Sequence, residues 1–206
     1  MIAIIDYGAG NLRSVQKACQ FVGADAIITS SPDEIRSADH VILPGVGAFG
    51  DCMASLEKSG LVEVIKEVAL SGKPFLGICL GMQLLFESSE ESPQVKGLGI
   101  FEGEIVKITE TDGFKIPHMG WNSLSFKKQS PIFEGLDENP FVYFVHSYYM
   151  KPKDKSIIAA ETEYCGTLPI ALSYNNIFAT QFHPEKSGDV GLKILKNFIE
   201  YKGGNI

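Results

Sequence analysis

The sequence predicts an α/β fold: a mostly parallel sheet with helices on both faces and an antiparallel β extension in the C-terminal half. In the first half, short apolar runs alternate with segments of helical periodicity, as in parallel sheets covered on both faces. In the second half, strand-like runs follow one another with turn residues between them, which is typical of hairpins and meanders. The 206 residues, 45% of them hydrophobic, are enough for one domain over residues 1–206 with a full core.

The first half contains four largely apolar runs of strand length. They are Ile2–Asp6, Ala26–Thr29, Val41–Leu43 and Lys73–Cys79. Their shortness and apolar character are those of strands buried on both faces. Parallel sheets bind ligands at the carboxyl ends of their strands, so functional residues are expected where these runs end.

Helices are predicted between these runs. The first begins after Asn11, a residue suited to cap a helix N-terminus, and ends at Gly23. The second begins at Ser31-Pro32-Asp33-Glu34, which combines a cap, a proline at the first helical position and a glutamate in the capping-box place. The amphipathic segment Leu61–Leu70 forms the third.

The second half, from Gly97 onward, is richer in strands. The predicted strands are Gly103–Thr109, Phe141–Val145, Ile157–Glu161, Ile170–Tyr174 and Ile177–Gln181. Turn residues such as Asn175-Asn176 separate them, and an amphipathic helix over Asp189–Tyr201 closes the chain. Together the two halves predict a flavodoxin-like sheet that is extended on one side by antiparallel strands.

Composition excludes several classes of function. The net charge is −7 and no basic run is present, which disfavours nucleic-acid binding. The longest apolar stretch, Phe75–Phe86, is too short and too rich in glycine to span a membrane, and the N-terminus has no signal-peptide pattern. We therefore expect a cytoplasmic protein. The four cysteines have no zinc-like spacing and are expected to be free thiols, and no metal or cofactor is expected.

Cys79 stands out among the cysteines by its local context. Gly77-Ile78-Cys79-Leu80-Gly81 follows a predicted strand and precedes a predicted helix, Met82–Phe86. A nucleophile between two glycines is typical of a tight strand-to-helix turn that exposes its reactive atom at a helix N-terminus. A buried cysteine in a glycine-rich strand end would give the same local sequence, so this motif alone leaves both interpretations open.

A histidine and a carboxylate near the C-terminus favour the catalytic interpretation. In Gln181-Phe182-His183-Pro184-Glu185, the histidine follows an apolar strand and the glutamate lies two residues further on. A cysteine nucleophile needs a base, and the base needs an acidic partner to orient it. On its own this histidine would be taken as structural. Together with the turn at Cys79, it predicts a triad of Cys79, His183 and Glu185.

The stretch Gly45-Val46-Gly47-Ala48-Phe49-Gly50 matches the dinucleotide-binding pattern but follows the third predicted strand instead of the first. No strand that ends in an acidic residue follows at the required distance, so nucleotide binding is not predicted. Glycines also let backbone N–H groups approach a ligand closely. We therefore expect Gly45, Val46 and Gly47, together with the amide of Leu80, to stabilise an oxyanion.

The other three histidines and the aromatic run receive structural interpretations. His40 begins a predicted strand, His118 lies beside the only tryptophan, and His146 ends an aromatic strand. Each is interpreted as structural. The run of phenylalanine and tyrosine over 141–149 is interpreted as core.

These motifs together resemble those of the class I (triad-type) glutamine amidotransferases. Beyond Gly-Ile-Cys-Leu-Gly, five longer motifs, in order, are similar to those of one group of glutaminase subunits in this family. They are Asp6-Tyr7-Gly8-Ala9-Gly10-Asn11-Leu12, Pro44-Gly45-Val46-Gly47-Ala48-Phe49, Pro117-His118-Met119-Gly120-Trp121-Asn122, Phe144-Val145-His146-Ser147-Tyr148 and His183-Pro184-Glu185-Lys186-Ser187-Gly188. The resemblance covers essentially the whole chain.

The resemblance implies hydrolysis of L-glutamine through a thioester on Cys79. It implies that Gln83, Ser147 and Tyr148 hold the glutamine. It also implies that the ammonia passes to a synthase partner with cyclase activity, folded as a (β/α)₈ barrel, in a heterodimer. The residues that match positions facing that barrel are Asn11, Trp121 and Lys186.

Three alternatives compete with this prediction. A DJ-1-like enzyme would share a similar sheet and a cysteine turn, but such proteins lack a late His-Pro-Glu. A glutaminase that serves another synthase, such as one in surface-sugar modification, is poorly separated by sequence. A non-enzymatic scaffold is disfavoured by the intact Cys79, His183 and Glu185.

Overall fold

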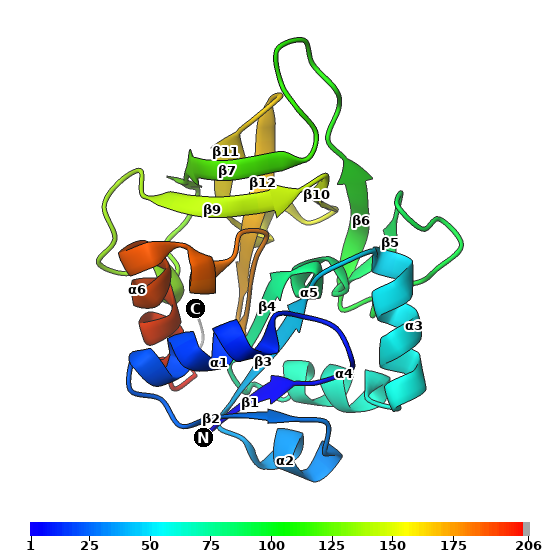
Figure 1. Cartoon of the computed structure of the whole chain (residues 1–206), viewed down its shortest axis with the longest axis vertical. Coiled ribbons are helices and arrows are strands. Elements are labelled where there is room, and N and C mark those ends of the chain that lie inside the picture. Colours follow the sequence, from blue (N-terminus) through cyan, green and yellow to red (C-terminus); the bar gives the residue numbers. More distant parts are fainter. Residues whose placement is uncertain (204–206) are drawn as a thin grey trace.

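The computed structural model describes residues 1–203, and the last three residues of the expected domain, 204–206, lie outside it. Its centre is a sheet in the order β2-β1-β3-β4-β13-β12-β11-β8 (Figure 1). The parallel part consists of β2 (Ala26–Thr29), β1 (Ile2–Ile5), β3 (His40–Gly45), β4 (Phe75–Cys79) and β13 (Ile177–Thr180). The antiparallel part consists of β12 (Thr167–Tyr174), β11 (Ile158–Glu163) and β8 (Ser125–Phe126). The predicted fold class is confirmed.

Helices cover both faces of the sheet. One face packs against α1 (Leu12–Phe21) and α6 (Gly188–Glu200), and the other against α2 (Pro32–Ser37), α3 (Phe49–Ser59) and α4 (Val62–Leu70). Strand β1 shows why both faces of the sheet are covered. Ile2 and Ile4 are buried in the core beneath α1 and α6, whereas Ala3 and Ile5 are buried in the other. Alternate side chains of a strand point to opposite faces, so a wholly apolar strand fits only between two layers.

Two smaller sheets extend this core. One contains β10 (Tyr148–Pro152), β6 (Phe101–Lys107) and β5 (Phe86–Ser89), and the other is the antiparallel pair β7 (His118–Ser123) and β9 (Phe141–His146). Figure 1 shows β7 and β9 side by side across the top of the view. The remaining elements are single turns: α5 (Leu80–Gln83), η1 (Pro131–Phe133), η2 (Lys155–Ile157) and η3 (Pro184–Lys186).

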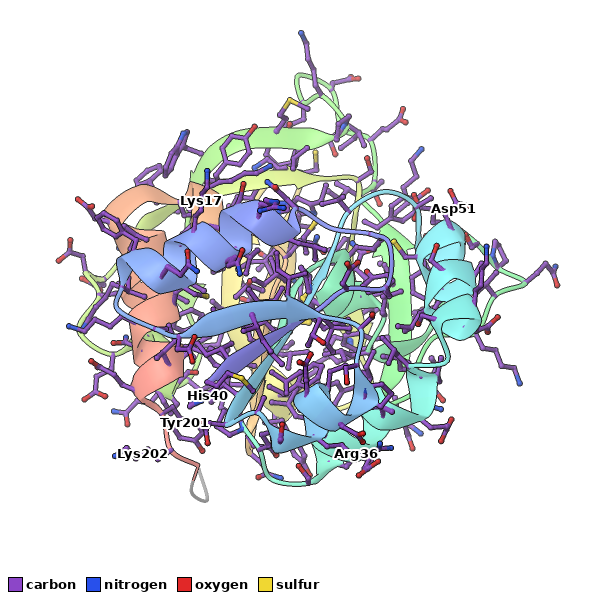
Figure 2. All side chains as sticks on the ribbon, turned by 60° about the horizontal axis from the view of Figure 1, so that its bottom comes forward. Lys17, Arg36, His40, Asp51, Tyr201 and Lys202 are labelled. Carbon is purple, nitrogen blue, oxygen red and sulfur yellow. The ribbon has the colours of Figure 1, made fainter. Side chains whose placement is uncertain are left out.

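The residue that follows α6 is hydrogen-bonded to the start of β3. The ring Nε2 of His40 donates a hydrogen bond to the carbonyl oxygen of Tyr201, 2.7 Å away, and Figure 2 shows the two residues close together. The His40 ring also packs edge-on against Phe198 of α6. These contacts agree with the structural interpretation of His40. None of the helices in the described part of the chain is long and apolar enough to cross a membrane.

The local predictions were wrong around α5 and incomplete elsewhere. The helix expected over Met82–Phe86 is instead the single turn Leu80–Gln83, and Phe86 begins β5. The helical run is overridden because Phe86 pairs with Phe101 in β6. Helix α3 was missed because its first residues lie in the glycine-rich stretch that was interpreted as a loop. Strands β7 and β10 were missed as well. Strand β7 is interrupted by Gly120 and is only partly buried, so it lacks the apolar run of a core strand.

Of the two predicted helix caps, that of Ser31 is confirmed and that of Asn11 is not. Asn11 precedes α1 but its side chain makes no capping hydrogen bond. Ser31 does cap α2, because its Oγ accepts from the amide of Glu34 at 3.5 Å. The glutamate does not complete the capping box. Its carboxylate accepts from the Thr29 hydroxyl, and Thr29 Oγ1 in turn accepts from the Ser31 amide.

Candidate active site

The predicted catalytic residues meet at the carboxyl ends of three adjacent strands. Strand β4 lies between β3 and β13, and all three run parallel. Cys79 ends β4, Gly45 ends β3 opposite it, and His183 follows the end of β13. The ends of parallel strands share one edge of the sheet, so residues far apart in the chain become neighbours there.

The backbone at Cys79 is bent as a nucleophile turn requires. Its φ is 54° and its ψ −111°, a conformation that non-glycine residues adopt only under constraint. The flanking glycines make the turn possible. A Cβ atom on Gly81 would lie 1.9 Å from the carbonyl oxygen of Leu43, and one on Gly77 would lie 3.0 Å from the carbonyl oxygen of Gly81. The predicted reason for both glycines, a lack of space for a side chain, is confirmed.

His183 and Glu185 form a buried pair. The ring Nδ1 lies 2.9 Å from a carboxylate oxygen of Glu185, and the two side chains are 2% and 1% exposed. The backbone fixes this pair from both sides. The His183 amide donates to the Tyr143 carbonyl at 3.1 Å, and the Ser187 hydroxyl donates to the His183 carbonyl at 2.6 Å. Pro184 begins the single turn η3, which sets the spacing of the histidine and the glutamate.

The pair is built to hold a proton. Burial disfavours the charged ring, but the nearby Cys79 thiol and the Glu185 carboxylate outweigh it and raise the pKa of His183 to about 10. Nδ1 is occupied by Glu185, whereas Nε2 is buried and has no hydrogen-bond partner among the described residues. The free nitrogen can therefore exchange a proton with a group in the cavity.

A cavity of about 310 Å³ opens above Cys79. Its lining comes from several loops and strands: Val46, Gly47, Cys79, Leu80, Gln83, Glu91, Pro117, Val145, His146, Ser147, Tyr148 and His183. Most of the predicted site residues are therefore brought together. Gly45 is not part of the lining. It is buried in β3, where a Cβ atom would lie 2.8 Å from the Gly81 amide nitrogen, so it serves the packing of the turn.

Sequence reasoning missed Glu91. Among the described residues that line the cavity it carries the only carboxylate, and it also accepts a hydrogen bond from the amide of Phe49 at 2.7 Å. The next amide of α3, that of Gly50, donates to Ser92 at 3.1 Å. The start of the helix after the glycine-rich stretch is thus already capped by an acidic and a neutral side chain, which disfavours a phosphate there. No motif around Glu91 indicates this position.

His118 and His146 form a second histidine pair, next to the cavity. His146 Nδ1 donates to the Tyr148 carbonyl at 2.9 Å, so its Nε2 is left to accept from His118 Nδ1, also at 2.9 Å. Burial lowers the pKa of His118 to about 4 and that of His146 to about 3. Both rings are therefore neutral at physiological pH. This agrees with the structural interpretation, although His146 also lines the cavity.

Two of the predicted partner-facing residues lie close together. Trp121 on β7 is 55% exposed, and its ring approaches Gly188, where a Cβ atom would lie 3.8 Å from Cη2. Lys186, two residues before Gly188, is exposed at the end of η3. Asn11 precedes α1, which contacts η3. No group of three or more histidine, cysteine or acidic side chains within residues 1–203 is placed to hold a metal ion.

Residues 3–201 match the family Glutamine amidotransferase class-I, and the chain therefore belongs to this class of glutamine-hydrolysing enzymes. Among curated proteins, it is 55% identical over 200 residues to imidazole glycerol phosphate synthase subunit HisH of Caldanaerobacter subterraneus subsp. tengcongensis, covering 97% of this chain and 98% of that one. The corresponding subunit of Methanocaldococcus jannaschii is 51% identical, covering 97% and 99%. Within its class the chain belongs to the HisH family, the glutaminase subunits of histidine biosynthesis.

Solved structures with low sequence identity share the fold. The PurLQS structure from Thermotoga maritima superimposes with a TM-score of 0.76 at 19% identity, covering 97% of both chains. The glutaminase domain of CTPS from Trypanosoma brucei gives a TM-score of 0.66 at 16% identity, covering 97% of this chain and 93% of the other. At such identities the likeness extends to the fold alone.

Proposed function

We propose that Cys79, His183 and Glu185 hydrolyse L-glutamine through a cysteinyl thioester, and that the ammonia passes to a (β/α)₈-barrel cyclase subunit, HisF-like in kind. That subunit would use it to form imidazole glycerol phosphate and an aminoimidazole carboxamide ribotide. The observation that carries the proposal is the buried His183–Glu185 pair beside the strained turn of Cys79, with a small cavity above them.

The first half-reaction forms the thioester and releases ammonia. The Cys79 thiolate attacks the side-chain amide carbon of glutamine, and the carbonyl electrons move onto oxygen. When the tetrahedral intermediate collapses, the C–N bond breaks and His183 Nε2 gives its proton to the departing nitrogen. Glu185 holds the ring by Nδ1 and stabilises its charged form before the transfer.

The second half-reaction returns the enzyme to its starting state. His183, now neutral, takes a proton from a water molecule that attacks the thioester carbon. The C–S bond breaks, glutamate leaves, and the thiolate and the charged ring are restored. No cofactor is needed, because each proton that leaves His183 is returned in the same cycle.

The backbone supplies the oxyanion donors in this proposal. Leu80 is the first residue of α5, so its amide has no acceptor within that turn. Val46 and Gly47 line the cavity together with Cys79 and Leu80. The Leu80 N–H and one N–H from Val46 or Gly47 would stabilise the charge that develops on the carbonyl oxygen.

The cavity lining also carries polar groups that suit the amino-acid end of glutamine. Gln83, Ser147 and Tyr148 line it and are proposed to hold this end of the substrate. Glu91 adds the carboxylate that the α-ammonium group requires, and it is already fixed by the Phe49 amide. Glutamine carries an α-ammonium and an α-carboxylate group, and binding of this end leaves its side-chain amide directed toward Cys79.

The partner is proposed to dock on the face that carries Asn11, Trp121 and Lys186. Trp121 and Phe141 are exposed on β7 and β9, at 55% and 56%. A large apolar side chain and a cation on one face are typical of protein interfaces. The partner would also prevent hydrolysis of glutamine whose ammonia is not used. This would follow if the Val46–Gly47 peptide turned its N–H into the cavity only when the barrel is loaded.

The Cys79→Ala variant tests the proposal, assayed with the barrel subunit present. Glutamine hydrolysis should be lost, whereas synthesis from added ammonium should continue at the rate of the unaltered complex. Retained hydrolysis would remove Cys79 from the mechanism. Loss of both activities, with binding of the barrel intact, would argue against ammonia as the product that is passed on. Equal hydrolysis rates with and without the loaded barrel would exclude control through the peptide.

A further inference from the structure

The mechanism leaves one fully buried polar side chain beside the nucleophile without a role. Gln181 lies between the end of β13 and His183 and is 0% exposed. Its amide Nε2 lies 3.6 Å from the Sγ of Cys79, within the range of a hydrogen bond to sulfur. A buried amide is costly unless its donors and acceptors are satisfied, so its position has to be explained by its partners.

The partners fix which way the Gln181 amide faces. The Tyr148 carbonyl can only accept, so the nearby amide nitrogen of Gln83 points toward it, at 3.5 Å. The same Gln83 nitrogen donates to the Oε1 of Gln181 at 3.0 Å. Because the oxygen of Gln181 is held by Gln83, its nitrogen must face the sulfur of Cys79.

We propose that Gln181 is a positioning residue for the nucleophile: its amide N–H donates to the Cys79 sulfur, favours the thiolate and holds the sulfur below the cavity. The inference rests on the proposed role of Cys79. A hydrogen bond to the charged form of a group stabilises that form, and a buried donor is stronger than an exposed one. His183 would balance the thiolate charge, while Gln181 sets the direction of the sulfur.

This arrangement links the substrate cavity to the nucleophile through one side chain. Gln83 lines the cavity, whereas Gln181 is fully buried and is absent from the lining. A ligand that engages the Gln83 amide therefore acts on the same group that orients Gln181. Occupancy of the cavity at Gln83 is therefore expected to change the hydrogen bond that Gln181 donates to the sulfur.

The test is the pH dependence of alkylation of Cys79 by iodoacetamide in the full-length chain, followed by mass spectrometry of the peptide that contains Cys79. This readout needs neither glutamine nor the barrel, and it separates Cys79 from the other three cysteines. In Gln181→Met the side chain keeps its length and loses its N–H donors. We expect the midpoint of the alkylation profile to rise by about one pH unit, and the rate at pH 7 to fall roughly tenfold.

A matched control separates this effect from a general loss of stability. Asn197 is another buried amide, and it donates to the carbonyls of Ile132 and Glu134 at 3.2 and 2.8 Å. The Asn197→Leu variant should be destabilised but should keep the unaltered alkylation midpoint. An unchanged midpoint in Gln181→Met, or an equal shift in Asn197→Leu, would overturn the proposal.

If Gln181→Met does not fold, Gln83→Met decides the question. It removes the group that orients Gln181 and leaves Gln181 itself in place. A raised midpoint supports the positioning role, and an unaltered midpoint rejects it. The proposed function is judged separately by Cys79→Ala: an active Cys79→Ala variant would refute the nucleophile, whereas an inactive one with an unshifted Gln181→Met profile would refute only the role of Gln181.

Discussion

The thiol of Cys52 on α3 donates a hydrogen bond to the carbonyl oxygen of Val46, with 3.4 Å between Sγ and the oxygen. Burial raises the pKa of the Cys52 thiol, so it stays protonated and able to donate at neutral pH. The carbonyl belongs to the Val46–Gly47 peptide, whose N–H is a candidate oxyanion donor. In this structure the contact holds that carbonyl toward α3, and turning the peptide over requires breaking it.

The Cys52→Ala variant should therefore hydrolyse glutamine faster than the unaltered chain when no barrel is present. A hydrogen bond of this kind contributes about 1 kcal/mol, so the gain should be roughly fivefold. Cys52→Ser is the matched variant, because its hydroxyl can still donate to Val46 and should keep the low rate. Equal basal rates of glutamine hydrolysis in all three proteins would show that Cys52 does not control the Val46–Gly47 peptide.

The Glu185→Gln variant should lose most glutamine hydrolysis, by about 10²- to 10⁴-fold in kcat. The carboxylate is one of the two groups that raise the pKa of His183 to about 10. Without it the ring loses its proton at a lower pH, so the alkaline limb of the pH–rate profile should move toward neutrality. A profile recorded from pH 6 to pH 11 measures both effects. An alkaline limb that stays in place would mean that another group holds the proton.

The neutral pair His118 and His146 should make the folded chain sensitive to acid. Both pKa values lie below the ordinary value of 6.5, at about 4 and about 3, so the unfolded chain binds these protons first as the pH falls. Their stability contribution is complete above pH 6.5 and is lost progressively toward pH 3. Between pH 7 and pH 5 the loss should be about 1–2 kcal/mol per histidine.

Urea titrations of His118→Phe against the unaltered chain measure this effect. Phenylalanine keeps a ring for stacking on Phe144 and Tyr164, whose centroids lie 4.7 and 3.9 Å from that of His118. The variant should have a flatter dependence of the unfolding free energy on pH. Parallel curves for the two proteins would mean that other groups dominate the acid response.

The Gly81→Ala variant should lose more stability than a substitution at an ordinary turn glycine. Its Cβ atom would lie 1.9 Å from the Leu43 carbonyl oxygen, so β3 or the turn at Cys79 has to move. The loss should be about 3 kcal/mol or more. Gly72→Ala is the control: Gly72 has a φ of +87° but open space around it, so only about 1–2 kcal/mol should be lost. Thermal or urea unfolding decides between them.

The Trp121→Ala variant should weaken binding of the barrel about tenfold or more while it leaves basal glutamine hydrolysis unchanged, because a large exposed aromatic side chain is a common centre of binding energy. Phe21→Ala offers a fair comparison, since Phe21 is 78% exposed on α1 and was not predicted to face the partner. Titration calorimetry with the cyclase subunit gives both affinities. Equal losses in the two variants would place the interface elsewhere.

The parallel strands, and the meeting of Cys79, His183 and Glu185 at one edge of the sheet, were predictable because each carries a local pattern. The apolar runs ended where β1, β3 and β4 end to within one or two residues, and the glycines around Cys79 have the steric role that the motif predicts. Patterns of this kind depend only on residues that are neighbours in the sequence. The predicted fold class and family rest on them and are confirmed.

Other features had no local pattern to reveal them. Glu91 lies in the cavity lining with its carboxylate held by the Phe49 amide of α3, and Gln181 reaches Cys79 because β13 lies beside β4. Helix α5 was misplaced because the ladder between β5 and β6 overrides the helical run. Such contacts arise from tertiary packing, and a single sequence does not encode them as motifs.

The place of β13 beside β4 has a consequence for the newly made chain. Cys79 and Gln181 are 102 residues apart, and His183 comes later still. Until β13 has left the ribosome, β4 has an unpaired edge, and Cys79 lacks both the base and the amide donor that we propose for it. On the proposed mechanism, the emerging polypeptide is therefore unable to consume glutamine until β13 and the segment that carries His183 have been added.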